Sequence, residues 1–313
     1  MRRAVFPTLI LLLLTSVAYA QRGDNIVTND GKTERGEIVE ISPKEVTVMI
    51  RNRATPIEVS KIKTITFEKE PSAMRAVREA IADGQLDQAV AAMQRIVAGD
   101  IERDVVKQEL AFLQARVKAL QAKDGSATPA EATAAMQQFF GRHPKSWRAA
   151  AALESLGDLA MQTGDSKGAA THYFNLAKIS SGVVKLRSTV RSADALRTMG
   201  DAKNAMKMYG RVRNADATTP AEQRQQTMAT VGAMALAAAG GKAEQAITAL
   251  QKVIADNDAS DVELFGRAYN ALGDCYRSAN KPTDAALAYL HTCLLYTSPS
   301  PRDATLSRMP SSA

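Results

Sequence analysis

The sequence has few aromatic, cysteine and histidine residues, and each shortage excludes a class of protein. Only 5% of its 313 residues are aromatic, so Ala, Leu, Val, Ile and Met must supply most of the 45% that are hydrophobic. These residues favour close-packed helices over a large sandwich or barrel. Two cysteines exclude a disulfide scaffold and a four-cysteine zinc site, and three scattered histidines exclude a histidine-rich metal cluster. We therefore expect a mainly helical protein, and its length suggests two domains.

The sequence also lacks the motifs of several enzyme classes. It contains no phosphate-binding loop, no dinucleotide-binding G-x-G-x-x-G after a strand, and no H-E-x-x-H zinc motif, and we expect no G-x-S-x-G nucleophile elbow. His143, His172 and His291 stand alone in the sequence, which is typical of structural or solvent-facing histidines. We therefore expect no enzyme, no cofactor and no metal.

Residues 1–20 have the organisation of a secretory signal peptide. Arg2 and Arg3 form a charged start, residues 9–14 an apolar centre, and Ala18–Ala20 a small-x-small cleavage site. The alternative is an uncleaved membrane anchor, but the apolar run is shorter than the roughly 20 residues that span a bilayer. We expect a periplasmic or extracellular protein with no membrane span after cleavage.

The last 21 residues, 293–313, abandon the helical pattern of the sequence before them. The string CLLYTSPSPRD at 293–303 resembles the translation of a transposase-type sequencing adaptor, and LSRMPSSA at 306–313 fits the continuation of that adaptor. We therefore predict that 293–313 is a disordered artefact and that the natural chain is truncated near Thr292. The alternative is a natural Ser- and Pro-rich disordered tail.

The net charge is weak once both ends are set aside. The whole chain carries +7, and the two ends contain four arginines and one aspartate, so the remainder carries about +4. Nucleic-acid-binding proteins normally have a clustered basic stripe, and these charges are evenly spread. We expect no nucleic-acid partner. The one cysteine outside the tail, Cys275, is interpreted as a small buried helix residue.

Residues 21–70 alternate apolar and polar side chains with the period of two that is typical of strands. Turn residues interrupt the alternation at 29–31, 42–44 and 52–54, which predicts about five short antiparallel strands. A sheet of this size must curl to cover its own apolar face, so we predict a small all-β barrel, SH3-like or Sm-like. Its role is either a binding module or a packing cap for the helices that follow.

From residue 71 to residue 292 the apolar spacing becomes three and four, which predicts amphipathic helices. Two segments, 153–173 and 269–289, share one template of Leu-Gly, turn residue, alanine and tyrosine at matching offsets. An alanine of this kind recurs at 89, 132, 169, 205, 246 and 285. Small residues let two antiparallel helices approach closely, and Gly or Asn between the helices allows the positive φ that reverses the chain.

This template resembles the tetratricopeptide repeat. The resemblance covers 71–292 and implies an α-solenoid of helical hairpins that binds a protein or peptide on its concave face. The spacings between the recurring alanines are 43, 37, 36, 41 and 39 residues, longer than the repeat norm of about 34. The helices or loops should therefore be longer than usual. The alternative is a generic alanine-rich helical bundle.

In tetratricopeptide-repeat proteins the first helix of each hairpin lines the concave groove, so the resemblance implies a partner-binding site there. The residues at the groove-facing offsets are Glu154, Asp158 and Met161, then Val190, Asp194 and Arg197, then Asn270, Asp274 and Arg277. Asp194 with Arg197, and Asp274 with Arg277, have the spacing of ion pairs along one helix face. The alternative is that all of these are ordinary exposed helix residues. The family's Asn and Lys clamps for a carboxylate terminus are mostly Asp here, so that ligand is not expected.

Together these expectations describe an exported, non-enzymatic scaffold of the cell envelope that binds a peptide or partner protein. The alternative is the N-terminal fragment of a larger envelope enzyme or assembly factor whose working domain lies beyond residue 292. Carbohydrate binding is disfavoured, because the only tryptophan, Trp147, lies where a helix starts. An array that ends near Thr292 should have a frayed or under-packed last hairpin, since each repeat buries its face on its neighbours.

Overall fold

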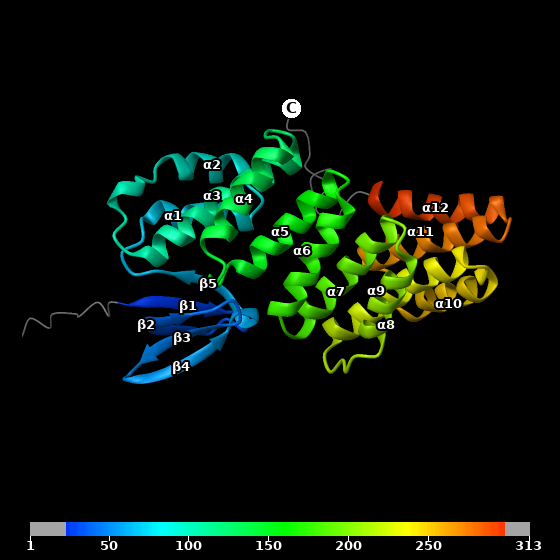
Figure 1. Ribbon diagram of the computed structural model, residues 1–313, viewed down its shortest axis with the longest axis horizontal. Coiled ribbons are helices and arrows are strands. Elements are labelled where there is room, and N and C mark those ends of the chain that lie inside the picture. The colour runs from blue at the N-terminus through cyan, green and yellow to red at the C-terminus, as the bar shows by residue number, and fades with distance from the viewer. Residues whose placement is uncertain (1–22, 298–313) are drawn as a thin grey trace, which may run out of the picture.

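The computed structural model of the protein describes residues 23–297. These residues form a five-stranded antiparallel sheet followed by α-helices α1 to α12 (Figure 1). The prediction of a mainly helical chain with a small N-terminal β part is confirmed. The expected signal peptide at 1–20 and residues 298–313 of the adaptor-like segment lie outside the described residues.

The sheet is an antiparallel meander whose last strand returns to pair with the first. Its strands are β1 (Asp24–Thr28), β2 (Thr33–Ile41), β3 (Glu45–Ile50), β4 (Arg53–Glu58) and β5 (Ile62–Thr66). They are ordered β4-β3-β2-β1-β5, so β4 and β5 are the edges. A 3-10 turn at Val59–Lys61 connects the two edge strands. The five predicted strands are therefore present, but the pairings among the described residues form an open sheet and do not show the predicted closed barrel.

The helices pair consecutively as antiparallel hairpins, from α1/α2 to α11/α12. Their bounds are α1 (Ser72–Ala82), α2 (Leu86–Gln94), α3 (Asp104–Asp124), α4 (Pro129–Arg142), α5 (Ala149–Gln162), α6 (Ser166–Ile179), α7 (Gly182–Thr198), α8 (Ala202–Arg213), α9 (Pro220–Ala239), α10 (Ala243–Asp256), α11 (Val262–Ser278) and α12 (Pro282–Thr297). A short 3-10 turn, Ala98–Asp100, lies between α2 and α3.

The hairpin template of the sequence is confirmed in detail. The six recurring alanines all lie on second helices, and their exposed fractions are 0% to 5%. In five hairpins the residue five positions earlier has a positive φ, and these residues are Gly84, Gly164, Gly200, Gly241 and Asn280. The left-handed backbone explains the choice of Gly or Asn at the turn, because other side chains rarely adopt it.

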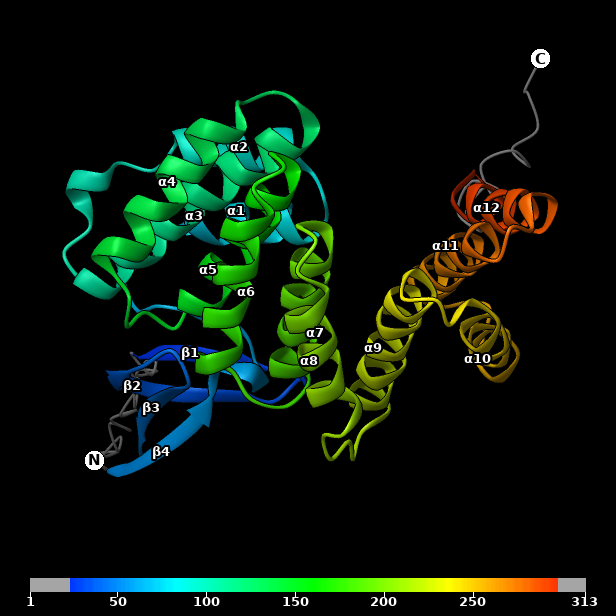
Figure 2. The same cartoon turned by 45° about the vertical axis from the view of Figure 1, so that its right-hand side comes forward.

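The described residues form two large hydrophobic cores and a small cluster between them, where Ala169 and Tyr173 of α6 pack against Ala195 of α7. The first contains the inner face of the sheet, with Ile26 and Val48, together with residues of α1 to α5 such as Met74 and Leu113. The second spans α7 to α12. Figure 2 shows the sheet beneath the first helices and α9 to α12 extending away from it. The sheet therefore packs as a layer against the first helices and shares their core.

A buried ion pair fixes the sheet to the helices. Asp24 on β1 is 1% exposed, and Arg103, just before α3, donates to its carboxylate at 2.6 and 3.0 Å. The same carboxylate accepts the backbone N–H of Ile38 at 3.0 Å and that of Glu68 at 2.8 Å. All of these donors compensate the cost of removing the carboxylate from water.

The last helix differs from the prediction made for it. Helix α12 is continuous to Thr297, so residues 293–297 are helical, and the prediction of a disordered segment from residue 293 is wrong for them. Ala285 and Ala288 are buried against α11, whereas Leu287 and Leu290 on the outer face are each more than half exposed. The last hairpin is therefore formed, and only its outer face lacks the packing that a neighbouring hairpin would provide.

Within residues 23–297, no helix combines the length and the apolar character that a membrane crossing requires.

Replacing Asp24 by alanine should destabilise the protein strongly. The change leaves the Arg103 guanidinium half-buried without its carboxylate, and such a loss costs about 3 kcal/mol of unfolding free energy. Urea unfolding followed by circular dichroism measures it, with Asp87→Ala on the exposed start of α2 as control. Equal midpoints for the two variants would contradict this role of the ion pair.

The two cysteines should differ in reactivity. Cys275 is fully buried in α11, and burial raises the pKa of its thiol to about 11, whereas Cys293 is exposed. Because the thiolate is the reactive form, iodoacetamide should modify Cys293 in the native protein and Cys275 only in urea. Peptide mass spectrometry distinguishes the two sites, and native labelling of Cys275 at the rate of Cys293 would disprove the assignment.

Candidate functional site

The residues predicted to bind a partner lie on three first helices and fall into separate groups. Helix α5 carries Glu154, Asp158 and Met161, helix α7 carries Asp194 and Arg197, and helix α11 carries Asn270, Asp274 and Arg277. Met161, Arg197, Asn270 and Arg277 are exposed, whereas the acids are partly buried or hold partners within the chain. Contacts within the chain therefore engage the predicted acids. Val190 of α7 is only 2% exposed and belongs to the core, so its expected place in a groove is wrong.

The recurring aspartate accepts a hydrogen bond from a tyrosine on the second helix of its own hairpin. The hydroxyl groups of Tyr173 and Tyr209 donate to Asp158 at 2.6 Å and to Asp194 at 2.5 Å. Tyr289 donates to Asp274 in the same way at 2.8 Å. In each case the tyrosine lies on the second helix, 15 residues after the acid. Burial, together with the neighbouring carboxylate, raises the pKa of Tyr173 and of Tyr209, so both remain protonated donors.

The sequence contained a signal for this pairing. In the α9/α10 hairpin, the position equivalent to the aspartate is Ala235 and the position equivalent to the tyrosine is Leu250, counted from the turn residue Gly241. Aspartate and tyrosine are thus present together in three hairpins and absent together from this one. The joint absence indicates that the acid serves the fold.

The tyrosine rings also explain the glycine of the Leu-Gly pair. A Cβ atom at Gly157 or Gly273 would overlap the ring of Tyr173 or Tyr289, respectively. The prediction that this glycine permits close helix approach is therefore confirmed, and a tyrosine ring is what fills the space.

Ion pairs join the first helices of neighbouring hairpins. Arg191 on α7 contacts Glu154 at 3.2 Å and Asp158 at 2.9 Å on α5, and Arg187 contacts Glu154 at 3.0 Å. The charges of both predicted acids are therefore balanced by arginines of the next hairpin.

Only one of the two expected ion pairs within a helix is present. Arg277 contacts Asp274 at 3.2 Å. Asp194 pairs instead with Arg267 of α11, 73 residues away and at 2.7 Å, so the expected pairing of Asp194 with Arg197 is wrong. Arg267 thus links the α7/α8 hairpin to the α11/α12 hairpin, which are not neighbours in sequence.

A hollow between the sheet and the first helices contains two of the residues predicted to bind a partner. We call it the sheet-array cleft: a cleft of about 700 Å3 lined by β5, α1, α3, α5 and the Arg187 side chain of α7. Glu154 and Asp158 belong to its wall, while Lys63 and Thr64 contribute from the sheet. A smaller hollow of about 390 Å3 adjoins it along α5 and α7 and shares Glu154 and Arg187.

Buried ion pairs support the floor of the sheet-array cleft. The Glu109 side chain is fully buried and accepts from Arg148 at 3.0 and 2.5 Å. The Arg148 guanidinium also lies 3.7 Å from the ring centroid of Trp147. Arg78 donates to Glu70, and its Nη1 atom lies 3.6 Å from Glu109 without a hydrogen bond among the described residues. These guanidinium groups are held in place before any partner arrives.

The walls of the sheet-array cleft carry charges of both signs that are not neutralised. Lys63 and Arg116 form no ion pair within the described residues, and neither do Glu79 and Asp83. Within residues 23–297 the Arg116 side chain makes one hydrogen bond, which it donates to the hydroxyl of Ser155 at 3.1 Å. The cleft therefore offers cations and carboxylates to a polar partner.

The described residues contain no group of three His, Cys, Asp or Glu side chains that could hold a metal ion. A Gly-x-Ser-x-Gly string does occur, at Gly164–Gly168. It forms the turn from α5 to α6, where Asp165 accepts the N–H of Gly168 at 2.8 Å and caps the helix. A nucleophile of this motif lies between a strand and a helix, so these residues are interpreted as turn and cap residues.

Comparisons with known proteins show similarity only at the level of solved structures. No family model and no curated protein matches the chain. A double mutant of MamA RS-1 is 17% identical, with a TM-score of 0.41 over 64% of this chain and 99% of that one. BtubC from P. vanneervenii is 15% identical, with a TM-score of 0.44 over 77% and 92%. A tetratricopeptide repeat protein from Parabacteroides merdae is 11% identical, with a TM-score of 0.44 over 75% and 95%. These values are too low to carry an inference on function.

Replacing Tyr209 by phenylalanine should destabilise the hairpin without creating a cavity. The change removes a hydrogen bond to a partly buried carboxylate, which contributes about 1.5 kcal/mol. Urea unfolding measures the loss. Tyr269→Phe is the matched control, because the Tyr269 hydroxyl makes no hydrogen bond within the described residues, and an equal effect of both changes would contradict the role of Asp194.

Proposed function

We propose that the protein is a non-enzymatic scaffold that binds an extended segment of a partner protein in the sheet-array cleft. A single observation carries the proposal: one cleft of about 700 Å3 combines an edge strand with unpaired charges of both signs. The resemblance of the helical hairpins to the tetratricopeptide repeat agrees with a binding role on the first helices.

The edge strand favours an extended ligand. Strand β5 is at the end of the sheet order, and among the described strands it pairs with β1 alone. Its residues Lys63 and Thr64 line the cleft. An edge strand presents backbone groups that a further strand can pair with, which is a common mode of peptide recognition.

The charges favour a ligand with polar side chains of both signs. Lys63 and Arg116 attract carboxylates, and Glu79 and Asp83 attract basic side chains. The row of arginines and acids on α5 and α7, from Glu154 to Arg191, continues this polar surface along the first helices. Because the recurring aspartates are engaged by tyrosines, we assign specificity to the unpaired charges of the cleft.

The proposal includes export to the cell envelope. Its support is the organisation of residues 1–20, with a charged start, an apolar centre and a small-x-small site. Fractionation of cells that express the tagged full chain tests it, with removal of residues 1–20 as control. Recovery of the full chain only with cytoplasmic markers would contradict this part of the proposal.

Partner binding is tested by site-specific photo-crosslinking with the full chain in envelope extract. A photoreactive residue at Thr64 should give an adduct of defined mass, and one at Thr248 on the exposed side of α10 should not. Lys63→Glu combined with Arg116→Glu should reduce the adduct roughly tenfold, the change expected for a loss of about 1.4 kcal/mol. Lys252→Glu on α10 is the matched control.

Two results would overturn the proposal. One is the same set of adducts from Thr64 and Thr248, which would indicate non-specific contact. The other is an adduct from Thr64 whose yield is unaffected by the charge reversal in the cleft. Circular dichroism and urea unfolding of the double variant establish that it is folded, so a reduced yield can be assigned to binding.

A further inference from the structure

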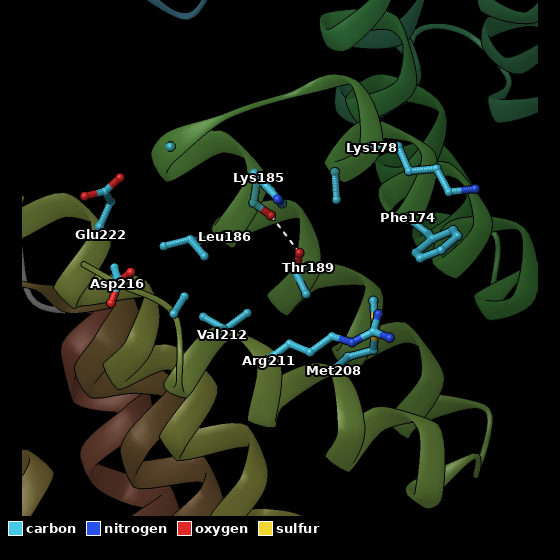
Figure 3. A pocket seen from close by; sticks show the side chains of 13 residues that line it. Phe174, Lys178, Lys185, Leu186, Thr189, Met208, Arg211, Val212, Asp216 and Glu222 are labelled. Carbon is cyan, nitrogen blue, oxygen red and sulfur yellow. Dashed lines mark hydrogen bonds between the residues drawn. The ribbon is translucent and has the colours of Figure 1, made fainter. Parts of the chain in front are cut away.

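A second hollow lies on the other side of α7 from the sheet-array cleft. We call it the α6–α9 hollow: a space of about 620 Å3 between the end of α6, the first half of α7, the end of α8 and the start of α9 (Figure 3). It shares no lining residue with the cleft. Lys185 and Leu186 of α7 line this hollow, whereas Val184 and Arg187 face the space beside the sheet.

The floor of the α6–α9 hollow is apolar. Leu186, Met208 and Val212 line it, and in Figure 3 Leu186 and Val212 lie near its middle. The Thr189 hydroxyl donates to the backbone oxygen of Lys185 at 2.8 Å, so its hydrogen is already used. The floor therefore offers apolar contact and no free hydroxyl hydrogen.

The rim of the hollow carries three cations and an aromatic ring, with Lys178 and Phe174 at one end and Lys185 nearer the middle (Figure 3). Lys178, Lys185 and Arg211 are exposed and form no ion pair within the described part of the chain. The ammonium group of Lys178 lies 4.3 Å from the ring centroid of Phe174, which is 38% exposed. Three cations without carboxylate partners beside an apolar floor are complementary to an acidic ligand with an apolar part.

The opposite end carries carboxylates. In Figure 3, Asp216 and Glu222 lie across the hollow from Lys178 and Phe174. The Glu222 carboxylate is held by the N–H groups of Thr218 and Thr219, each at 3.1 Å, as part of the cap of α9. A fatty acid whose carboxylate faced the cations would place the end of its alkyl chain against these carboxylates and remove them from water without compensation. The polarity of this end therefore favours a peptide over a fatty acid.

We propose that the α6–α9 hollow is a docking site for a short protein segment that carries acidic side chains beside one or two large apolar side chains. The apolar side chains seat on Leu186 and Val212, and the acidic side chains face Lys178, Lys185 and Arg211. This site is independent of the sheet-array cleft, so the scaffold has two separate places for partner segments.

Fluorescence polarisation with synthetic peptides tests the proposal on the full chain. The probe is a labelled heptapeptide, Ser-Leu-Asp-Asp-Leu-Asp-Ser, and its matched partners have Asn or Lys in place of Asp, or Ser in place of Leu. Only the Asp and Leu peptide should bind, and its affinity should fall as salt rises, because the exposed cations are screened.

Two arginines of one helix give the matched variants. Arg211→Glu should weaken binding of the probe at least tenfold, whereas Arg213→Glu, two residues later on α8 and outside the hollow, should have little effect. The variant of the sheet-array cleft, with Lys63→Glu and Arg116→Glu, should bind the probe normally. Its binding therefore distinguishes a failure of the α6–α9 docking site from a failure of the partner site in the cleft.

Several outcomes would overturn the proposal. They are absence of probe binding, equal binding of the Asn or Lys peptides, and equal loss with Arg211→Glu and Arg213→Glu. A dimer of the full chain in sedimentation that Arg211→Glu dissociates would also replace it, because the occupant would then be a second copy of this chain.

Discussion

The close approach of the two helices in each hairpin is the constraint on which the array depends. A buried alanine on the second helix brings the backbones together, and in two hairpins a glycine on the first helix leaves room for a tyrosine ring. The ring hydroxyl then reaches an aspartate one position after the glycine. Turn, alanine, glycine, tyrosine and aspartate therefore act as a unit. In α9/α10, one of the hairpins that lack this aspartate and tyrosine, fully buried Leu250 supplies apolar packing in their place.

Buried ion pairs hold the sheet on the first helices and hold those helices to one another, and the sheet forms one wall of the sheet-array cleft. Asp24 with Arg103, and Glu109 with Arg148, each place a carboxylate out of water and satisfy it with a guanidinium. Such pairs add little net stability over apolar packing, but an unpaired member is strongly unfavourable, so they select one arrangement. The alternative roles expected for the β part, a packing cap and a binding module, are thus compatible: the sheet shares the core of α1 to α5, and its edge strand forms one wall of the cleft.

Helix α7 connects the two proposed binding sites. Arg187 on one face joins α5 through Glu154 beside the sheet, and Lys185 and Leu186 line the α6–α9 hollow on another face. Asp194 near the end of the same helix is tied to α11 through Arg267. A partner that shifts α7 in one site would therefore disturb contacts in the other, and the ion pairs oppose such a shift.

The sequence by itself determined the hairpins, because their signals are local. Turn residues such as Gly164 and alanines such as Ala169 lie within one hairpin, and helical periodicity between them is set by the chain itself. The same offsets placed Glu154 and Asp158 correctly on a first helix. Tertiary structure alone decided what those acids contact and where a cleft forms, because the deciding pairs are far apart in sequence: 79 residues for Asp24 and Arg103, and 73 for Asp194 and Arg267. No local pattern specifies such pairs, since each depends on how whole hairpins and the sheet stack to bury their apolar faces.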